Sequence, residues 1–351
     1  MRQLLKRCGR ANVRRPSAWH FGWLGIVALL LASCAANGSS SPTVPVTTPS
    51  MIPGTISEFT VPTAGGSPEA ITAGPDGNIW FTEENRSKLG FINPTTLAFT
   101  EYNLPSPNNA MNTVSYGITA GPDKNIWFTE WNQDKIGFVT PQGKFTEYAL
   151  ANAAARPFGI VTGPDGDLWF TEAAGGMIGR ITTKGTITEF PLPAQSVPQE
   201  ITVGADGALW FTDVGTNSIG RITTDGTVTE YRLPASVNAL FGIAKAPDGK
   251  LWFTANGQAG SILPDGTGIT LYPFAAGFAG GRGITPGPDG TIWCTEFAGN
   301  AVASFAPNGT RTDYPLPNDA SRPSQIATGA DGNIWFTEVS SNRLGRIIPP
   351  K

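Results

Sequence analysis

A tetrapeptide that begins with tryptophan returns at a nearly constant interval through most of this chain. Its copies begin at Trp80, Trp127, Trp169, Trp210, Trp252, Trp293 and Trp335. Successive copies are 47, 42, 41, 42, 41 and 42 residues apart, and the usual reading is Trp-Phe-Thr-Glu. A fixed period of this length indicates a structural unit that is repeated along the chain. The body of the protein is therefore predicted to contain one supersecondary unit seven times.

Each unit contains four short runs of β-branched and aromatic residues. In the third copy these runs fall at 157–162, 167–172, 177–181 and 186–190, and turn residues separate them. No stretch shows the 3.6-residue period of a helix. Asp-Gly between the first two runs indicates a two-residue type I′ hairpin turn, in which both central residues need a positive φ. Each unit is thus predicted to be a four-stranded meander.

Units of about 42 residues with four strands each are typical of β-propeller blades. The predicted fold class is therefore all-β, a seven-bladed β-propeller of four-stranded blades. The last unit ends after 344–348 without a fourth strand, whereas the body begins with a lone strand at 55–62. That segment matches fourth strands such as 229–234. We expect the N-terminal outer strand to complete the last blade and close the ring, which removes a sheet edge.

The tryptophan and phenylalanine of each copy are predicted to be core residues. Consecutive strand residues point to opposite faces of a sheet, and both faces of a blade pack against neighbouring blades. The aspartate of each Asp-Gly turn is interpreted as structural. A calcium loop would need several oxygen ligands at alternate positions, and each turn offers one.

The first 57 residues contain no acidic residue, and six basic residues precede an apolar run at 21–31. This pattern predicts a secretory signal at 1–33, because the run is too short to span a bilayer comfortably. Residues 31–34, Leu-Ala-Ser-Cys, resemble the lipobox of bacterial lipoproteins, which implies acylation of Cys34. An ordinary signal peptide with a chance cysteine is the alternative. The expected location is extracytoplasmic in the bacterial cell envelope, with membrane contact only through the lipid anchor.

The segment 34–54 is rich in Ser, Thr and Pro, which is typical of an extended tether. The propeller then occupies 55–351. Loss of 1–33 removes six basic residues and leaves a net charge of about −9, which argues against nucleic acid as a partner. Cys294 is the one cysteine of the body, so no disulfide framework is expected. We expect a monomer that is held together by its core.

Two rings of side chains are predicted at one end of the central channel. If the Asp-Gly hairpins are regular, Ala70 lies opposite Glu83 and Glu69 lies beside it. The first ring varies between blades, as a binding surface would, and comprises Glu69, Tyr116, Phe158, Gln199, Phe241, Arg282 and Ser324. The second ring is almost uniformly acidic and comprises Glu83, Glu130, Glu172, Asp213, Ala255, Glu296 and Glu338.

Converging carboxylates raise one another's pKa or recruit a cation. Mg²⁺ or Ca²⁺ is the cation expected to bind there, since both prefer oxygen ligands. The metal-ligand candidates are Glu296, Glu338 and Glu83, with Mg²⁺ as the candidate cofactor. The alternative is that each carboxylate is solvated or accepts hydrogen bonds at a strand end. A Gly-rich segment at 275–283 leads to the channel near Arg282 and matches no phosphate-binding pattern.

The repeated frame resembles one known family. It reads Gly-Ile-Thr-x-Gly-Pro-Asp-Gly-x-Ile/Leu-Trp-Phe-Thr-Glu, followed by Ile-Gly-Arg-Ile and Thr-Glu-Tyr/Phe-x-Leu-Pro. From 55 to 351 it is similar to the virginiamycin B lyase (streptogramin lyase) family of seven-bladed propellers. The resemblance implies elimination across an ester bond of cyclic depsipeptide antibiotics, with a divalent cation, glutamates and an essential histidine.

The sequence departs from that family at the histidine. The one histidine is His20, inside the predicted signal peptide. By the hairpin alignment the family's base falls near Arg282, and arginine cannot be deprotonated to act as a base. The resemblance carries Glu296 over as a metal ligand.

Two hypotheses follow, and the fold alone does not decide between them. The first is a lipid-tethered binding module that holds a small molecule, a glycan or a protein at the central channel face. The second is a divergent metal-dependent lyase in which a carboxylate of raised pKa replaces histidine. Its catalytic candidates are Glu296, Glu69 and Arg282. A positioned base contributes about 10²–10⁴-fold to a rate, so the missing histidine favours the first hypothesis.

Overall fold

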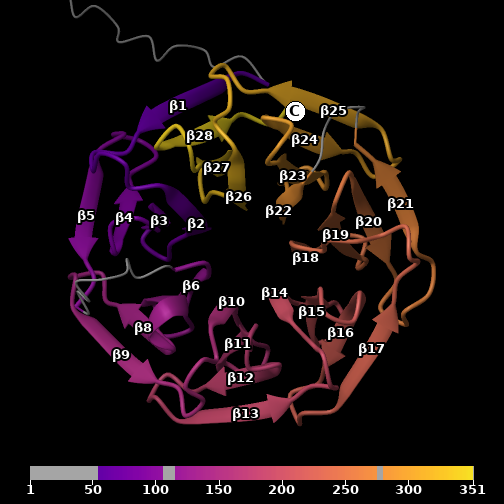
Figure 1. The fold of residues 1–351 in the computed structure, drawn as a ribbon. Coiled ribbons are helices and arrows are strands. Elements are labelled where there is room, and N and C mark those ends of the chain that lie inside the picture. The colour runs from indigo at the N-terminus through magenta and orange to yellow at the C-terminus, as the bar shows by residue number, and fades with distance from the viewer. Residues whose placement is uncertain (1–53, 106–114, 275–279, 351) are drawn as a thin grey trace, which may run out of the picture. The chain divides into compact units, whose positions relative to one another are not determined.

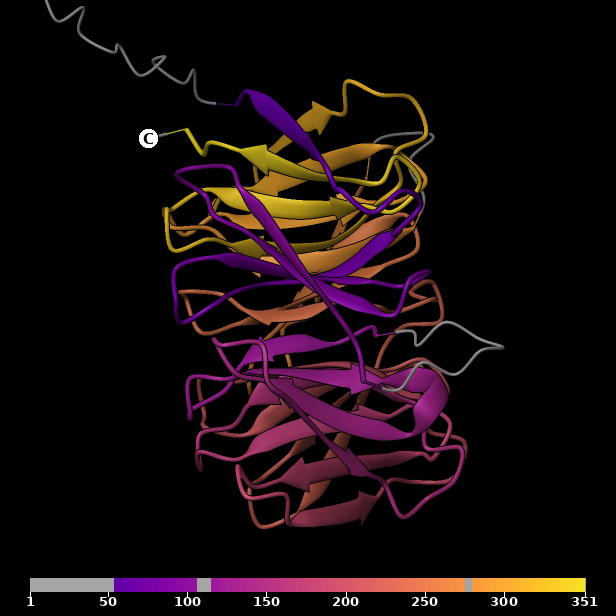
Figure 2. The same ribbon diagram turned by 90° about the vertical axis from the view of Figure 1, so that its left-hand side faces the viewer.

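Seven four-stranded antiparallel sheets form a closed ring in the computed structural model, which describes residues 54–105, 115–274 and 280–350. Figure 1 shows the sheets arranged around a central axis, with the first strand of each sheet innermost. Seen from the side, the strands run between the two faces of the disc (Figure 2). The prediction of an all-β, seven-bladed propeller is confirmed. The signal peptide, Cys34 and the tether as far as residue 53 lie outside the described residues.

Each blade contributes four short strands, counted here from the channel outward. In the first four blades they are β2 (Pro68–Ala73), β3 (Ile79–Glu83), β4 (Lys88–Ile92), β5 (Phe99–Asn103); β6 (Ile118–Ala120), β7 (Ile126–Glu130), β8 (Lys135–Val139), β9 (Phe145–Ala149); β10 (Pro157–Thr162), β11 (Leu168–Glu172), β12 (Met177–Ile181), β13 (Ile187–Pro191); and β14 (Pro198–Val203), β15 (Leu209–Asp213), β16 (Ser218–Ile222), β17 (Val228–Arg232). In the last three they are β18 (Ile243–Lys245), β19 (Leu251–Ala255), β20 (Gln258–Ile262), β21 (Thr270–Pro273); β22 (Gly281–Pro286), β23 (Ile292–Glu296), β24 (Ala301–Phe305), β25 (Arg311–Pro315); and β26 (Pro323–Thr328), β27 (Ile334–Glu338), β28 (Arg343–Ile347), β1 (Ile56–Thr60). One 3₁₀ turn, η1 (Trp131–Gln133), is the sole helical element of the described residues, and it is far too short to cross a membrane.

The ring is closed by the strand that begins the body. β1 is the outer strand of the last blade and pairs antiparallel with β28, with Ile56 opposite Ile347 and Thr60 opposite Arg343. The predicted closure by an N-terminal outer strand is therefore confirmed. The outer edge of the last blade is thus covered by a segment from the other end of the body.

The loop between the first and second strands of a blade differs from the predicted one. In the first blade the Gly74 N–H donates to the Asn78 carbonyl at 2.8 Å, so the loop contains three residues, 75–77. Within this loop only Gly77 has a positive φ, of 78°. Three-residue hairpin loops place a glycine in this left-handed position, whereas a type I′ turn needs positive φ at two positions. The prediction of a two-residue turn is wrong.

The extra loop residue changes the register of the inner hairpin. Ala73 lies opposite Ile79, and a β-bulge between Pro68 and Ile71 then places Pro68 opposite Glu83. The predicted pairing of Ala70 with Glu83 is therefore wrong. Equivalent bulges occur in β10, β14, β22 and β26.

The repeated aromatic residues form the contacts between blades. Trp80 packs in one cluster with Phe128 of the next blade, and Trp335 packs with Phe81, so the last blade joins the first in the same way. Six of the seven repeat tryptophans are at most 1% exposed, and Trp252 is 4% exposed. The prediction that these residues form the core is confirmed.

Candidate functional site

The threonine of each repeated tetrapeptide fixes the inner strand of the next blade. Thr129 Oγ1 accepts a hydrogen bond from the Gly117 N–H at 3.0 Å and donates one to the Phe158 carbonyl at 2.9 Å. The seven threonines donate at 2.5–2.9 Å to the carbonyls of Ser115, Phe158, Gln199, Phe241, Arg282, Ser324 and Glu69. Six of these acceptors belong to the predicted first ring, and the seventh precedes Tyr116. The core thus holds the ring backbone at the channel.

Three side chains of the first ring form a polar group, in which Glu69 and Ser324 are buried and Arg282 is partly exposed. Glu69 Oε1 accepts hydrogen bonds from Ser324 Oγ at 2.7 Å and from Arg282 Nη1 at 3.0 Å. Arg282 Nη1 also donates to Ser324 Oγ at 3.0 Å. Glu69 is 2% exposed, and burial raises its pKa although Arg282 and Ser324 act in the opposite direction. The guanidinium lies 4.0 Å from the Phe297 ring centroid and 5.1 Å from that of Phe241.

The other side of the ring carries an aromatic cluster. Tyr116 and Phe158 are stacked, with centroids 4.7 Å apart, and Trp131 meets both edge to face at 5.3 and 5.6 Å. Phe158 in turn meets Phe241 edge to face at 5.6 Å. The Tyr116 hydroxyl lies 3.4 Å from Glu84 Oε1, and burial together with nearby carboxylates raises the pKa of Tyr116 to about 12. Tyr116 therefore stays neutral at physiological pH.

We define the channel mouth as Glu69, Tyr116, Trp131, Phe158, Phe241, Arg282, Phe297 and Ser324. Sequence reasoning missed Trp131 and Phe297, which directly follow the tetrapeptides of the second and sixth blades. The position directly after the tetrapeptide varies between blades, as the first ring does, and this variation could have identified it as part of the site. Gln199 belongs to the predicted ring, and its buried Oε1 has no hydrogen-bond partner among the described residues.

A second polar contact crosses the channel one residue beyond the ring. This position is small in five blades, and its occupants are Ala70, Gly117, Gly159, Glu200, Gly242, Gly283 and Gln325. The two long side chains come from β14 and β26, on opposite sides of the ring (Figure 1). Gln325 Nε2 donates a hydrogen bond to Glu200 Oε1 at 2.6 Å. The pair forms a bar across the channel.

The small residues make room for this bar. A Cβ on Gly159 would lie 3.1 Å from Glu200 Oε2, and a Cβ on Gly283 would lie 2.8 Å from Gln325 Oε1. A cavity of about 130 Å³ adjoins the bar, with Tyr116 and five isoleucines among its lining residues. Burial raises the pKa of Glu200 to about 8, although the hydrogen bond from Gln325 lowers it. Sequence reasoning missed Glu200, which stands out as a long side chain in a row of small ones.

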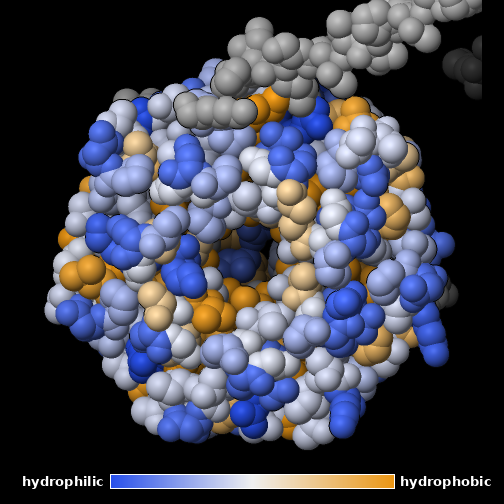
Figure 3. Space-filling model, turned by 180° about the vertical axis from the view of Figure 1, so that it is seen from behind, coloured by the Kyte–Doolittle hydropathy of each residue, from blue (hydrophilic) through white to orange (hydrophobic). Residues whose placement is uncertain are grey.

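Figure 3 shows the central opening on one face of the disc. Polar residues lie within the hollow, and apolar residues gather on part of its edge. A ligand that enters from a face would thus meet apolar and polar surface at the same opening.

The acidic second ring lies inside the blades and not on an exposed rim. Its six acids are at most 1% exposed. Glu83 lies two residues from Phe81 on the same face of β3, so its side chain enters the space between blades. Burial and the Glu101 carboxylate of the outer strand β5 together raise the pKa of Glu83 to about 7. The prediction of an acidic channel rim formed by these residues is therefore corrected.

Each of these acids has a carboxylate neighbour in the outer strand of its own blade. The pairs are Glu83 with Glu101, Glu130 with Glu147, Glu172 with Glu189, Asp213 with Glu230, Glu296 with Asp313 and Glu338 with Glu58. In the fifth blade both members are missing. Ala255 ends the second strand, and Leu271 lies opposite Gly260 as Glu101 lies opposite Gly90. The two acidic positions are thus absent together.

The three candidate metal ligands do not come together. Glu296 Oε1 pairs with Arg311 Nη2 at 2.6 Å, Glu338 Oε2 accepts from Ser341 Oγ at 2.6 Å, and Glu83 neighbours Glu101. Across the residues that the structure describes, no group of three His, Cys, Asp or Glu side chains could hold a metal ion. The Mg²⁺ cofactor stays a prediction. Residues 275–279 of the Gly-rich segment lie outside the described residues.

The chain is similar in sequence and in structure to known proteins of one family. The sequence profile of the virginiamycin B lyase family matches residues 109–351. A streptogramin B lyase structure is 35% identical, covers 83% of this chain and 96% of its own, and has a TM-score of 0.78. A catalytically inactive histidine-to-alanine variant of virginiamycin B lyase from Staphylococcus aureus, with quinupristin, is 34% identical. It covers 84% of this chain and 99% of its own, with a TM-score of 0.79.

A more distant match shares the fold alone. The extracellular domain of a putative hybrid two-component system from B. thetaiotaomicron is 15% identical, with a TM-score of 0.63, and covers 80% of this chain and 40% of its own. No curated protein matches the sequence.

Proposed function

The chain belongs to the virginiamycin B lyase family, and we propose that this member is a module that binds a ligand at its channel mouth. The observation that carries the proposal is the aromatic cluster of Tyr116, Trp131 and Phe158 beside the polar group of Glu69, Ser324 and Arg282. Apolar walls with a few oriented polar groups are typical of small-molecule sites.

The chemistry of the mouth suits a ligand with a planar apolar part and a carbonyl or anionic part. Aromatic rings would stack on Phe158 and Tyr116, as offset aromatic pairs do. Arg282 uses Nη1 for Glu69 and Ser324, which leaves its remaining N–H groups for a ligand oxygen. The Glu200–Gln325 bar would limit how far a ligand enters the channel.

Binding of quinupristin tests this proposal, because a relative was solved with that ligand. We expect isothermal titration calorimetry to show binding by the propeller body, with an affinity at least tenfold weaker in Phe158→Ala and Arg282→Ala. The matched control is Leu263→Ala, which truncates an exposed leucine at the other end of the strands. Equal affinities of the mouth variants and the control would contradict the assignment of the site.

A second candidate function is a lyase in which Glu200 acts as the base. The observation that favours it is the position of Glu200 in the channel, beside the cavity lined by Tyr116, with a pKa of about 8. The Glu200 carboxylate would accept the proton removed during elimination, and Arg282 would stabilise negative charge on oxygen. This role replaces Glu296, whose carboxylate pairs with Arg311.

Product analysis separates the two candidates. The body is incubated with quinupristin and Mg²⁺, and the linear product is sought by mass spectrometry. A lyase would form product at a rate that rises through pH 8, and Glu200→Gln would lose product formation while it retained binding. Binding without any product would leave the binding module as the function.

We also propose export and lipid attachment at Cys34, on the strength of the basic start, the apolar run and the Leu-Ala-Ser-Cys sequence. Labelling of cells with palmitate should mark the wild-type protein and fail to mark Cys34→Ser. Label in the variant would contradict the assignment. A monomeric state stays a prediction that light scattering can check.

A further inference from the structure

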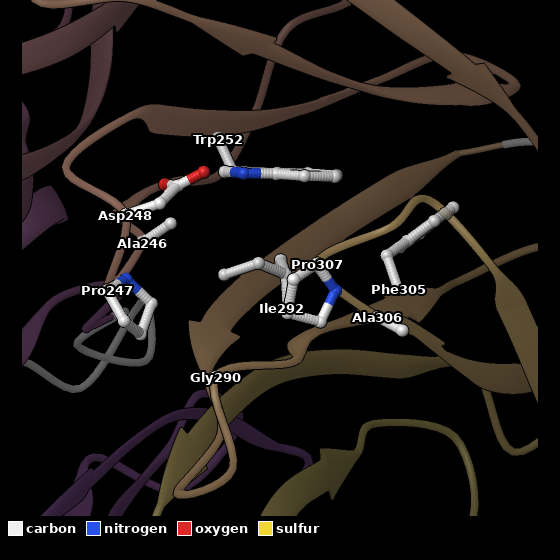
Figure 4. Close-up of a pocket in the computed structure, with 9 residues that line it drawn as sticks. All are labelled: Ala246, Pro247, Asp248, Trp252, Gly290, Ile292, Phe305, Ala306 and Pro307. Atoms are coloured by element: carbon white, nitrogen blue, oxygen red, sulfur yellow. The ribbon is translucent and has the colours of Figure 1, made fainter.

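A cavity of about 300 Å³ lies between the fifth and sixth blades, at the end of the strands opposite the channel mouth. Its lining side chains are mostly apolar (Figure 4). The lining residues are Ala246, Pro247, Asp248, Trp252, Gly290, Ile292, Phe305, Ala306 and Pro307. We call it the inter-blade cavity. It shares no lining residue with the mouth.

One substitution in the sequence distinguishes this joint from the others. Six blades have glycine at the start of the first hairpin loop, namely Gly74, Gly121, Gly163, Gly204, Gly287 and Gly329. A Cβ on any of them would lie closer than 3.0 Å to the tryptophan six residues later, a separation that real Cβ atoms do not show. The fifth blade has Ala246 at this position. In the arrangement of the other six blades, the Cβ of Ala246 would be too close to the indole of Trp252.

The substitution coincides with the loss of a hydrogen bond. In five blades the indole N–H donates to the loop aspartate at 3.0–3.2 Å, as Trp210 does to Asp206, and in the sixth blade Trp293 donates to Thr291. Among the described residues the indole N–H of Trp252 has no partner. Asp248 instead forms an ion pair with Lys250 at 3.0 Å.

The inter-blade cavity therefore has a free donor and a carboxylate on the same wall. Figure 4 shows the Asp248 carboxylate directed toward the nitrogen edge of the Trp252 indole. Pro247 and Pro307 stand on either side, and Ile292 and Phe305 complete the apolar surface. The Trp252 N–H can donate to a ligand carbonyl, and the Asp248 carboxylate can accept from a ligand N–H. An amide group carries both a carbonyl and an N–H.

We propose that the inter-blade cavity binds a planar aromatic amide. The ring system lies against Trp252 and the prolines, the amide oxygen accepts from Trp252 Nε1, and the amide N–H donates to Asp248. A volume of about 300 Å³ is at the small end of ligand pockets and suits two fused rings. The carboxylate of Asp248 disfavours an acid of the same shape.

Calorimetric titration of the propeller body with naphthalene-2-carboxamide tests the proposal, with naphthalene-2-carboxylate as the charged counterpart. We expect the amide to bind and the acid to bind at least tenfold more weakly. Ala246→Gly should restore the contact of Trp252 with Asp248 and weaken amide binding at least tenfold. Trp252→Phe keeps the wall but removes the donor, so binding should fall several-fold.

The matched control is Ala205→Gly, which removes an exposed methyl from the corresponding loop of the fourth blade. It should bind the amide like wild type. A second readout is the crystal structure of Ala246→Gly, in which Trp252 Nε1 should lie about as far from Asp248 as its counterparts lie from theirs. No amide binding by wild type, or equal binding by Ala246→Gly, overturns the proposal.

Discussion

Thr337 Oγ1 donates a hydrogen bond of 2.8 Å to the Glu69 carbonyl and so joins the last blade to the first. The same oxygen accepts from the Gln325 N–H at 3.0 Å. Both bonds are made by a threonine with no exposed surface. The closing joint of the ring thus has the same threonine-to-carbonyl hydrogen bond as the other six.

Thr337→Val should destabilise the propeller, because it leaves the Glu69 carbonyl and the Gln325 N–H without their shared partner. An unsatisfied buried group costs about 1–3 kcal/mol, so we expect a loss of that order in the free energy of unfolding. Urea denaturation measures it. Thr310→Val, at an exposed turn, is the control. Similar values for the two variants would show that the joint contributes nothing.

The buried carboxyl pairs predict a stability that falls as pH rises. Burial and Glu147 raise the pKa of Glu130 to about 8, and the pKa of Glu296 is raised to about 7. The folded state therefore holds protons that the unfolded chain has released above about pH 5. Stability should be highest near pH 5 and decline through pH 7–8.

Thermal melts from pH 5 to pH 9 measure this decline. Glu130→Gln, which cannot ionise, should make it shallower, whereas Asp319→Asn, at an exposed site, should leave the slope unchanged. A wild-type melting temperature that rises over this range would refute the explanation.

The fifth blade lacks both acids of the pair. We therefore expect the two carboxyl groups of a pair in the other blades to be coupled in their effect on stability. Burial and Glu189 raise the pKa of Glu172 to about 7, although Asn152 acts in the opposite direction. Glu172→Ala and Glu189→Leu reproduce the fifth-blade residues. The double variant should lose less stability than the sum of the single variants, with a coupling of about 0.5–3 kcal/mol in a denaturation cycle. Additive losses would mean that the two carboxyl groups act independently.

Gln325→Leu should raise the pKa of Glu200 above its value of about 8, because the amide N–H stabilises the ionised carboxylate. A ¹³C NMR titration of the glutamate carboxyl groups measures the shift. Gln258→Leu, on a different strand and away from the channel bar, is the control. An unchanged or lowered pKa would mean that the bond across the channel does not act on Glu200.

Much of the fold could be predicted because the period of the repeat is strict. Seven tryptophans at a spacing near 42 residues specify seven blades, and the unpaired segment at 55–62 specifies how the ring closes. The register could not be derived, because Asp-Gly occurs in two-residue and three-residue loops alike. One extra residue at Pro75 shifts every pairing in the inner hairpin.

The site was predicted in part, for a related reason. The variable ring was found because its residues differ between otherwise similar units, and the structure brings Glu69, Arg282 and Ser324 together. The acids of the second ring were misplaced, because exposure at a strand end depends on what covers that end. Glu200 was missed because its contact with Gln325 crosses the channel and joins blades that are not neighbours. Trp131 was missed although the position after the tetrapeptide varies between blades.

The pairing of β1 with β28 has a consequence for how the chain folds. Ile56 and Ile347 belong to opposite ends of the body, so their contact has a very large sequence separation. Contacts of this kind form late, because a long loop must be closed first. A growing chain can complete six blades in order along the sequence, but its first strand must wait for its last. Ring closure is therefore expected to be the final folding step, and a chain truncated before 343 would leave both ends of the ring open.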